Sequence, residues 1–564
     1  MKEQYIDIIE QSVGAYTVQE IRDYTQAVET DGLREHGYPR LTANIAILLA
    51  HGRRNDLKEL LPHMMTLCCE QLALPTVDGR GNDFSVKEIV LALLALEEKR
   101  LFSDEQMAAW RAKLAEIDPY TCYNEIAAVP PHRQNNWAAF AAASEQLRKY
   151  AEIGGAEIGD ESRFIDDQFA SQVLSFDENG MYRDPDEPMV YDLVTRLQMA
   201  VALHFGYDGV YRQEMEDAMR RAALPTLRMQ SVTGEIPFGG RSNQFLLNET
   251  FFAAICEYYA AWLHRLGEDD LAGQFRSAAR LAREYVLRAL TEKPINHVKN
   301  RYPRESRYGC EHYGYFNKYM VTTASWSYLA ALFADDSIPE RACPAQTGGY
   351  VWQSSPCFHK VIAAAGGYSV EYDTDADLYY DATGLGRIHF RDAPSALCLS
   401  VPFSPHPHYT IDLENPSPLS ICGGVADGDR WHLACDAGAR YTLLSQESGT
   451  DGTVTLRFCC DLPGGEALQE TCRIAPDGVT LSLTGGGRLC YMIPAFSFDG
   501  QTETERLFDA ATLTVRYKGW ECLWSTNGSL EDTGLVYANR NGHSRVFRAV
   551  GQDRLEIHIA MAKR

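Results

Sequence analysis

Apolar residues recur every three to four positions through roughly the first 340 residues of the chain. Clear examples are the segments 41–52 (LTANIAILLAHG), 57–73 and 85–99. With the first 30 residues included, this pattern predicts about twelve helices joined by polar loops. Six helical hairpins of this size favour an (α/α)6-type toroid. The competing arrangement, a superhelical stack, would show a fixed repeat of about 34 or 40 residues, and the sequence has none.

Beyond about residue 345 the period changes from helical to alternating. Short segments such as 367–375, 396–403, 453–462 and 554–562 alternate apolar and polar residues and are separated by Gly, Asp and Pro turns. This spacing is typical of an antiparallel β-sandwich. The sequence therefore predicts an α+β multidomain protein with a catalytic helical toroid over 1–340 and a β-sandwich over 345–564.

The net charge of the chain argues against two classes of binding partner. The 564 residues include 53 Lys and Arg against 77 Asp and Glu, a formal charge of −24. So acidic a chain argues against a nucleic acid or an anionic membrane surface as partner. An anionic substrate would have to be met by local arginines and lysines.

The sequence also indicates a compartment. The N-terminal MKEQYIDIIEQSVGAY has no basic or apolar signal region, and there is no uninterrupted apolar run of about 18 residues. The 15 cysteines show no zinc-binding spacing, which favours reduced, buried thiols. We therefore expect a cytoplasmic protein, unless a signal was removed, with no metal or other cofactor. A homo-oligomer is left open.

The most informative motif is Asn135-Asn136-Trp137, at the start of a predicted small-residue helix. Amides beside an indole suit sugar recognition, because the amides bond hydroxyls or a carboxylate and the ring offers an apolar face. The alternative is a helix cap, in which Asn135 or Asn136 only satisfies the first free N–H groups.

Segment 231–249 (SVTGEIPFGGRSNQFLLNE) is the second candidate. Gly239-Gly240 permits a close backbone approach, and Arg241 offers a forked cation suited to a carboxylate. Asn243 adds a neutral donor, and Glu249 lies further along, within the predicted helix. The alternative is a plain loop with Arg241 in a surface ion pair and Glu249 on a solvated face.

Two further loops lead into helices. In 176–196, Tyr191, Asp192 and Arg196 follow a polar, aromatic loop. The alternative is that Asp192 and Arg196, four residues apart on a helix, only form an ion pair with each other. In 302–319, tyrosines surround acidic and basic residues. Its candidate side chains are Glu311, His312, Tyr313 and Tyr315.

A toroid followed by a β-sandwich resembles one group of glycan-processing enzymes. The group comprises heparinase II/III-like and alginate-type polysaccharide lyases and several uronic-acid hydrolases, and glycoside hydrolase family 154 β-glucuronidases are the nearest resemblance. Asn135-Asn136-Trp137 is similar to an Asn-Trp element at the start of an inner helix of the lyases. Residues 179–184 followed by Tyr191 are similar to the element that places a catalytic tyrosine, although Asn179 replaces its first Asp. Residues 311–315 are the third motif, opening the last toroid helix.

The resemblance implies a uronic-acid oligosaccharide or polysaccharide substrate and leaves two mechanisms open. Hydrolysis needs two carboxylic acids, drawn from Glu249, Glu311, Asp192 and Asp184, with Asn136 and Arg241 holding the uronate. Since acids recur in every candidate loop, we expect an exo-acting hydrolase that releases β-linked glucuronic acid.

The alternative is a lyase acting by β-elimination. It would neutralise the uronate carboxylate with Asn136 or Arg241 and use His312 or Tyr191 as base. Tyr191, Tyr313 or Tyr315 would protonate the leaving oxygen. In both mechanisms Asn135, Trp137, Arg196 and Asn243 are expected to line the binding site. A non-catalytic glycan-binding protein is the remaining alternative.

Overall fold

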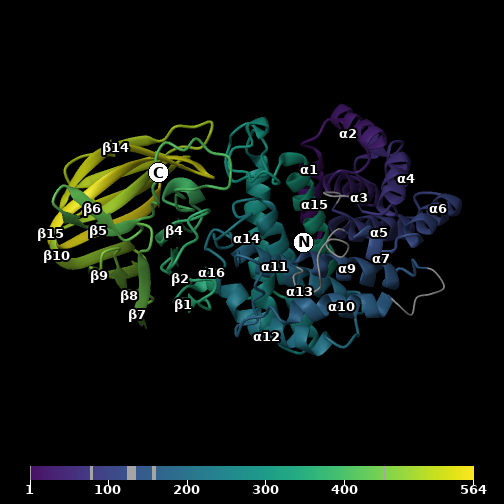
Figure 1. Cartoon of the computed structure of the whole chain (residues 1–564), viewed down its shortest axis with the longest axis horizontal. Helices are drawn as coiled ribbons and strands as arrows, with labels where there is room; N and C mark the ends of the chain where they lie inside the picture. The colour runs from purple at the N-terminus through teal and green to yellow at the C-terminus, as the bar shows by residue number, and fades with distance from the viewer. Residues whose placement is uncertain (1, 77–80, 124–134, 155–160, 450) are drawn as a thin grey trace.

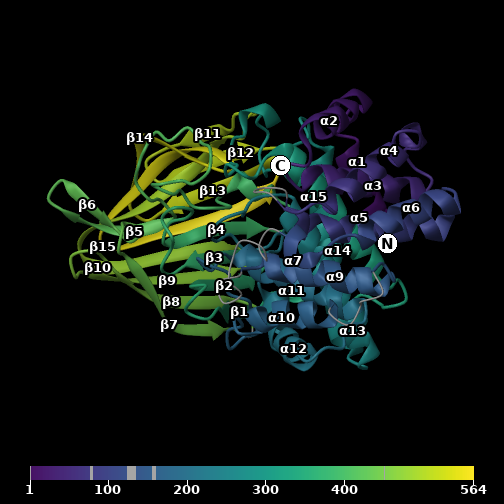
Figure 2. The ribbon, with the colours of Figure 1, turned by 45° about the vertical axis from the view of Figure 1, so that its right-hand side comes forward.

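The computed structural model describes the chain apart from residues 1, 77–80, 124–134, 155–160 and 450. Helices occupy one end of the molecule and strands the other (Figures 1 and 2). The described helices of more than four residues are α1 (Lys2–Val13), α2 (Val18–Asp31), α3 (Gly37–Ala50), α4 (Leu61–Leu72), α5 (Asn82–Lys99), α6 (Asp104–Ala115), α9 (Trp137–Tyr150), α10 (Glu161–Val173), α11 (Met189–His204), α12 (Arg212–Arg228), α13 (Leu247–Arg265), α14 (Asp269–Thr291) and α15 (Phe316–Phe333). Two short helices, α7 (Pro119–Cys122) and α16 (Pro344–Thr347), complete them.

Six of these helices form a closed inner ring. Going round it, α3 packs on α5, α5 on α9, α9 on α11, α11 on α13, α13 on α15, and α15 returns to α3. Other helices cover the ring from outside: α4 packs on α3 and α5, α10 on α9, α14 on α13, and α1 on α15. The predicted (α/α)6-type toroid is confirmed by this ring.

Burial explains why the inner and outer helices differ in sequence. Every residue of α3 is buried, whereas α12 buries one stripe that includes Met215, Met219 and Ala222. A helix enclosed on all sides is mostly small or apolar, with its buried polar residues paired, and an outer helix needs one apolar face. None of the described helices is both long and apolar enough to span a membrane.

The strands form two antiparallel sheets. The smaller has the order β1-β2-β3-β4, and the larger runs β11-β12-β13-β15-β10-β9-β8-β7, with β14 beside β15 and β5 joined to β10 and β6. The smaller sheet comprises β1 (Tyr350–Gln353), β2 (Lys360–Ala365), β3 (Tyr368–Asp373) and β4 (Gly384–Phe390). The larger comprises β5 (Cys422–Asp427), β6 (Arg430–Leu433), β7 (Arg440–Ser448), β8 (Val454–Asp461), β9 (Ala467–Ala475), β10 (Gly478–Phe498), β11 (Glu505–Phe508), β12 (Thr512–Tyr517), β13 (Trp520–Thr526), β14 (Ser529–Asn539) and β15 (Gly542–Lys563).

The smaller sheet is the layer that joins the helices to the larger sheet. Along β2, Val361 and Ala363 belong to the core shared with the larger sheet, and Ile362 and Ala364 to the core of the helices. Successive strand residues point to opposite faces, so both faces of this sheet are covered. The predicted sandwich is thus confirmed, with the smaller sheet buried on both sides.

One predicted strand was wrong. Segment 396–403 contains the end of a short 3-10 helix (Ser395–Leu397) and two isolated bridges, at Leu399 and Phe403. Pro402 has no N–H group for a sheet ladder, which limits the pairing of this segment.

Candidate active site

All six inner helices converge on one cavity at the centre of the ring. Its volume is about 80 Å³, and each helix contributes residues at or near its N-terminal end. Its lining consists of His36, Arg40, Phe84, Asn136, Trp137, Phe140, Val190, Tyr191, Val194, Ser242, Leu247, Asn248, Phe251, Tyr319, Thr322 and Trp326. Because helix N-termini carry partial positive charge, this arrangement favours an anionic group in the cavity.

The two asparagines have different roles: Asn135 caps the helix and Asn136 lines the cavity. The Asn135 side chain accepts a hydrogen bond from the Trp137 N–H at 3.0 Å, as a cap does. Asn136 precedes α9 but makes no side-chain cap bond, and its own N–H donates to Asp184 Oδ1 at 2.9 Å. The Asn136 amide therefore lines the cavity without a capping role. Trp137 packs edge-on against Phe84.

Tyr191 brings a phenol to the same cavity. Its hydroxyl lies 3.2 Å from Ser242 Oγ, which is 3.1 Å from the Tyr313 hydroxyl. The Arg241 guanidinium lies 4.5 Å above the Tyr191 ring. Burial raises the pKa of Tyr191, against the opposing effects of Arg241 and the Ser242 hydrogen bond.

The loop around Arg241 is held from several sides. Gly240 has φ +71°, and a Cβ there would lie 2.6 Å from Pro188 Cβ, so a close backbone approach requires glycine. The Gly240 N–H donates to Asp381 Oδ2 at 2.8 Å. Arg241 itself pairs with Asp184 and donates to the Pro185 carbonyl. The Asn243 amide donates to the Gly240 carbonyl at 2.5 Å and so folds the loop on itself.

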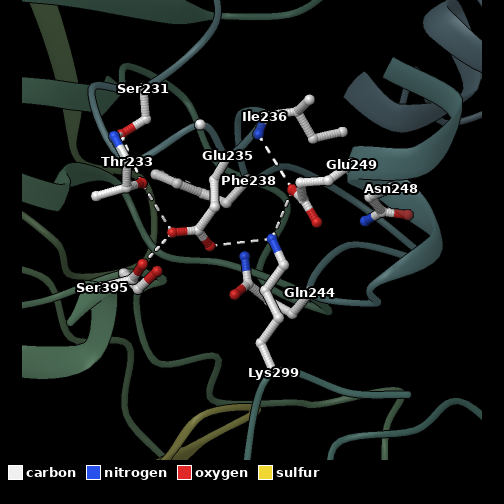
Figure 3. Close-up of polar contacts among 12 residues, drawn as sticks. Ser231, Thr233, Glu235, Ile236, Phe238, Gln244, Asn248, Glu249, Lys299 and Ser395 are labelled. Carbon is white, nitrogen blue, oxygen red and sulfur yellow. Dashed lines mark hydrogen bonds and ion pairs between the residues drawn. The ribbon is translucent and has the colours of Figure 1, made fainter. Parts of the chain in front are cut away.

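Glu249 lies in a different place, in a cluster beside the smaller sheet where its carboxylate and that of Glu235 are fully buried (Figure 3). Lys299 Nζ lies 2.8 Å from the Glu249 carboxylate and 3.0 Å from that of Glu235. The Ile236 N–H also donates to Glu249, at 3.2 Å. Burial, with the charge of Glu235, raises the pKa of Glu249 to about 7, although Lys299 opposes the rise.

The other predicted acids are also paired. On α11, Asp192 and Arg196 form a buried ion pair at 2.6 Å, and Asp192 also accepts from the Tyr182 N–H. Glu311 accepts two hydrogen bonds from Arg540 and one from the Ser242 N–H at 2.6 Å. None of these three side chains lines the central cavity.

His312 and Tyr315 lie apart from the cavity too. The His312 side chain is exposed and packs edge-on against Tyr313. The Tyr315 residue precedes α15, and its ring faces the cations of Arg307 and Lys318. The structure thus brings Asn136, Trp137 and Tyr191 together, with Arg241 and Tyr313 beside them.

The sequence interpretation missed several residues of the cavity. His36 Nδ1 accepts from Arg40 Nη1 at 2.7 Å, which leaves the proton of the neutral ring on Nε2. Burial also lowers the pKa of His36 well below its usual value. His36 directly precedes an inner helix, as Asn136 does, so the same rule would have found it. Arg540, which holds Glu311 and does not line the cavity, carried no such signal, because it lies in the turn between β14 and β15.

Comparison with protein-family models and with curated proteins finds no match. Among solved structures, the chain is similar to a heparinase III at 9% identity, covering 97% of this chain and 76% of that one, with a TM-score of 0.45. A heparan sulfate lyase from Pedobacter heparinus shows 10% identity, coverage of 97% and 78%, and a TM-score of 0.46. A family 88 glycosyl hydrolase from Bacteroides vulgatus shows 10% identity, coverage of 59% and 99%, and a TM-score of 0.38. None of these three reaches a TM-score of 0.5, and function is therefore argued from the side chains of the site.

Proposed function

We propose that the protein is a polysaccharide lyase that cleaves uronic-acid-containing glycans by β-elimination in the central cavity. One observation carries this proposal. Among the described residues that line the cavity there are amides, phenols, a histidine and an arginine, but no carboxylate. Elimination needs a neutralised carboxylate and a proton-transfer group, whereas hydrolysis needs two carboxylic acids.

The first role is to neutralise the substrate carboxylate. The Asn136 amide donates to it, in the field of six converging helix N-termini. Removing this negative charge from the carboxylate makes the neighbouring C5 proton more acidic. An amide neither takes nor gives a proton at neutral pH, so Asn136 holds the group and does not move the proton.

The second role belongs to Tyr191. As a phenolate, its oxygen takes the C5 proton; the C4–O bond then breaks and a C4=C5 double bond forms. Tyr191 returns the same proton to the leaving oxygen, so that the proton count closes within the site. The Arg241 cation, 4.5 Å from the ring, stabilises the phenolate.

An exo-acting glycoside hydrolase that releases β-linked glucuronic acid is the second candidate. It is favoured by Asp184 and Glu311, which hold the 240–242 loop beside the cavity. Each carboxylate is tied to an arginine, Asp184 to Arg241 and Glu311 to Arg540. Either would have to leave its partner to act as an acid.

Incubation with heparan sulfate, alginate, polygalacturonate and an aryl β-glucuronide separates the candidates. Elimination gives a 4,5-unsaturated uronate that absorbs in the ultraviolet, and hydrolysis gives saturated free uronic acid without it. We expect the ultraviolet product. Release of saturated glucuronic acid alone would refute the lyase, and tight glycan binding without any cleavage would refute both enzymes.

A further inference from the structure

Ser242 lies between two phenols that come from different parts of the ring. Its hydroxyl is 3.2 Å from Tyr191 at the start of α11 and 3.1 Å from Tyr313 in the loop before α15. A serine hydroxyl donates one hydrogen bond and accepts two, so it can accept from one phenol while donating to the other. Tyr313 is only partly buried and adjoins the exposed His312, whereas Tyr191 lines the cavity.

The backbone of Ser242 is strained. Its φ is +62°, in the left-handed region that disfavours residues other than glycine, and its side chain is more than nine-tenths buried. Such a conformation is unfavourable and persists only where the surroundings fix it. A glycine would adopt this backbone without cost, so strain at this position suggests that the hydroxyl itself is needed.

The restraint comes partly from the strands. The Ser242 N–H donates to Glu311 Oε1 at 2.6 Å, and the Asn248 amide donates to the Ser242 carbonyl at 3.1 Å. Arg540, from the turn between β14 and β15, holds Glu311 with both terminal nitrogens and also donates to the Asn243 carbonyl at 3.2 Å. The strand region thus fixes the strained serine through one buried ion pair.

We propose that Ser242 is a proton-relay and positioning residue that connects Tyr191 in the cavity to Tyr313 at its rim, and that the Glu311–Arg540 pair holds it in place. This inference rests on the proposed function, in which a Tyr191 phenolate takes the C5 proton. The Tyr191 phenol proton passes to Ser242 Oγ while Ser242 gives its own proton to the Tyr313 oxygen. Tyr313 releases its phenol proton to water. The relay leaves a phenolate at Tyr191 and a hydronium ion in solvent.

Several ionisable groups act on the Tyr191 phenol. Arg241 lies over its ring and lowers its pKa, while Asp184 and Glu311 raise it. Among the described residues that line the cavity, His36, Arg40 and Tyr319 are the further ionisable groups, and Tyr313 lies beside Ser242. The Ser242 hydrogen bond lowers the pKa of Tyr191, so removing the hydroxyl should raise it.

Two substitutions separate the hydroxyl from the backbone strain. Ser242→Gly removes the hydroxyl and relieves the strain, while Ser242→Ala removes the hydroxyl and keeps the strain. A hydrogen bond to a phenolate oxygen stabilises the charged form and lowers the pKa of the phenol by about one unit. We expect both variants to move the rising limb of the pH–rate profile up by about one unit, with kcat falling about tenfold below it and KM little changed. A purely structural serine would make Ser242→Gly harmless.

Gln244 provides the matched control. It lies in the same loop at φ +64°, and its side chain accepts from the Asn541 amide at 3.2 Å and not from a phenol. Gln244→Gly should therefore relieve a similar strain without moving the pH–rate profile. A shift as large as that of Ser242→Gly would overturn the relay.

A titration tests the relay without any substrate. The phenolate absorbance of Tyr191 is the difference between a protein and its Tyr191→Phe counterpart, measured with and without Ser242→Gly. We expect the midpoint to rise by about one unit in the Ser242→Gly background. An unmoved midpoint overturns the relay, even in an active lyase. A shifted midpoint in a protein that cleaves none of the glycans supports the relay and counts against the proposed function.

Discussion

The central cavity and the cluster of Glu235, Lys299 and Glu249 use their polar groups in opposite ways. The cluster has two buried carboxylates on one ammonium group; Glu235 and Lys299 line a second cavity of about 230 Å³, whereas Glu249 does not. The central cavity has no carboxylate among its described lining residues. Two of its polar groups are instead neutral: the Asn136 side chain makes no cap bond, and the Tyr191 hydroxyl forms a hydrogen bond with Ser242. The charges of the cluster are paired with one another, whereas the amide and the phenol of the central cavity are left to meet a ligand, so charge density alone does not mark a reactive site.

The largest expected effect would break this comparison. Tyr191→Phe should lower kcat about 10²–10⁴-fold, because it removes the proton-transfer group, while the melting temperature stays near that of the parent. Glu249→Gln is the matched substitution in the cluster and should keep most of the activity. An inactive Glu249→Gln at neutral pH beside an active Tyr191→Phe would place the reaction at the cluster and not in the cavity.

The cluster should matter for stability instead. Lys299→Met leaves two buried carboxylates without their cation, so the free energy of unfolding should fall by about 3–5 kcal/mol. Urea titration measures this loss. Lys518→Met, at an exposed ion pair with Glu292, is the control and should cost at most about 1 kcal/mol. Equal losses in the two variants would contradict the assigned role of the cluster.

Substitutions of Asn136 test the cavity directly. Asn136→Ala should lower kcat/KM on a uronic-acid glycan about 10²–10³-fold, since it removes a donor to the carboxylate. Asn136→Asp should be worse, because it places a negative charge opposite the substrate charge. Asn135→Ala, which removes a helix cap and not a described lining residue of the cavity, should cost about 1 kcal/mol of stability and little activity. Activity in Asn136→Asp equal to the parent would exclude the proposed contact.

The smallest expected effect concerns pH and stability. The pKa of Glu249 is about 7 in the fold, above the value of about 4.3 expected for an unfolded glutamate. A raised pKa in the folded state means that this group's contribution is fully present below about pH 4.3 and is lost as pH rises through about 7. Glu249→Gln should therefore flatten the fall in stability over this window. Parallel stability curves for the two proteins would contradict the assigned environment.

Periodicity predicted most of the fold, because the inner helices, the outer helices and the strands each impose their own spacing of apolar residues. It failed at 396–403, where the alternating apolar residues are buried but the backbone forms two isolated bridges and no continuous strand. Periodicity also could not reveal that the smaller sheet is buried on both faces, which depends on packing against the helices.

The site was only partly predictable. Asn136, Trp137 and Tyr191 could be found because each stands at the start of an inner helix, and all of these starts meet in one cavity. Glu249 and Asp192 looked equally suitable in sequence, but helix geometry turns them toward Lys299 and Arg196. The contact between Arg540 and Glu311 joins residues 229 positions apart, so local pattern gives no indication of it.

The central claim is that the cavity breaks a glycan by elimination, without adding water to the uronate. The most direct test is cleavage of a uronic-acid polysaccharide in water labelled with heavy oxygen, followed by mass spectrometry of the new ends. Elimination should leave an unsaturated uronate at the non-reducing end of one fragment, with no label introduced by the cleavage itself when exchange at the reducing end is blocked by reduction. A saturated uronate with one labelled oxygen at the cleaved bond would contradict it.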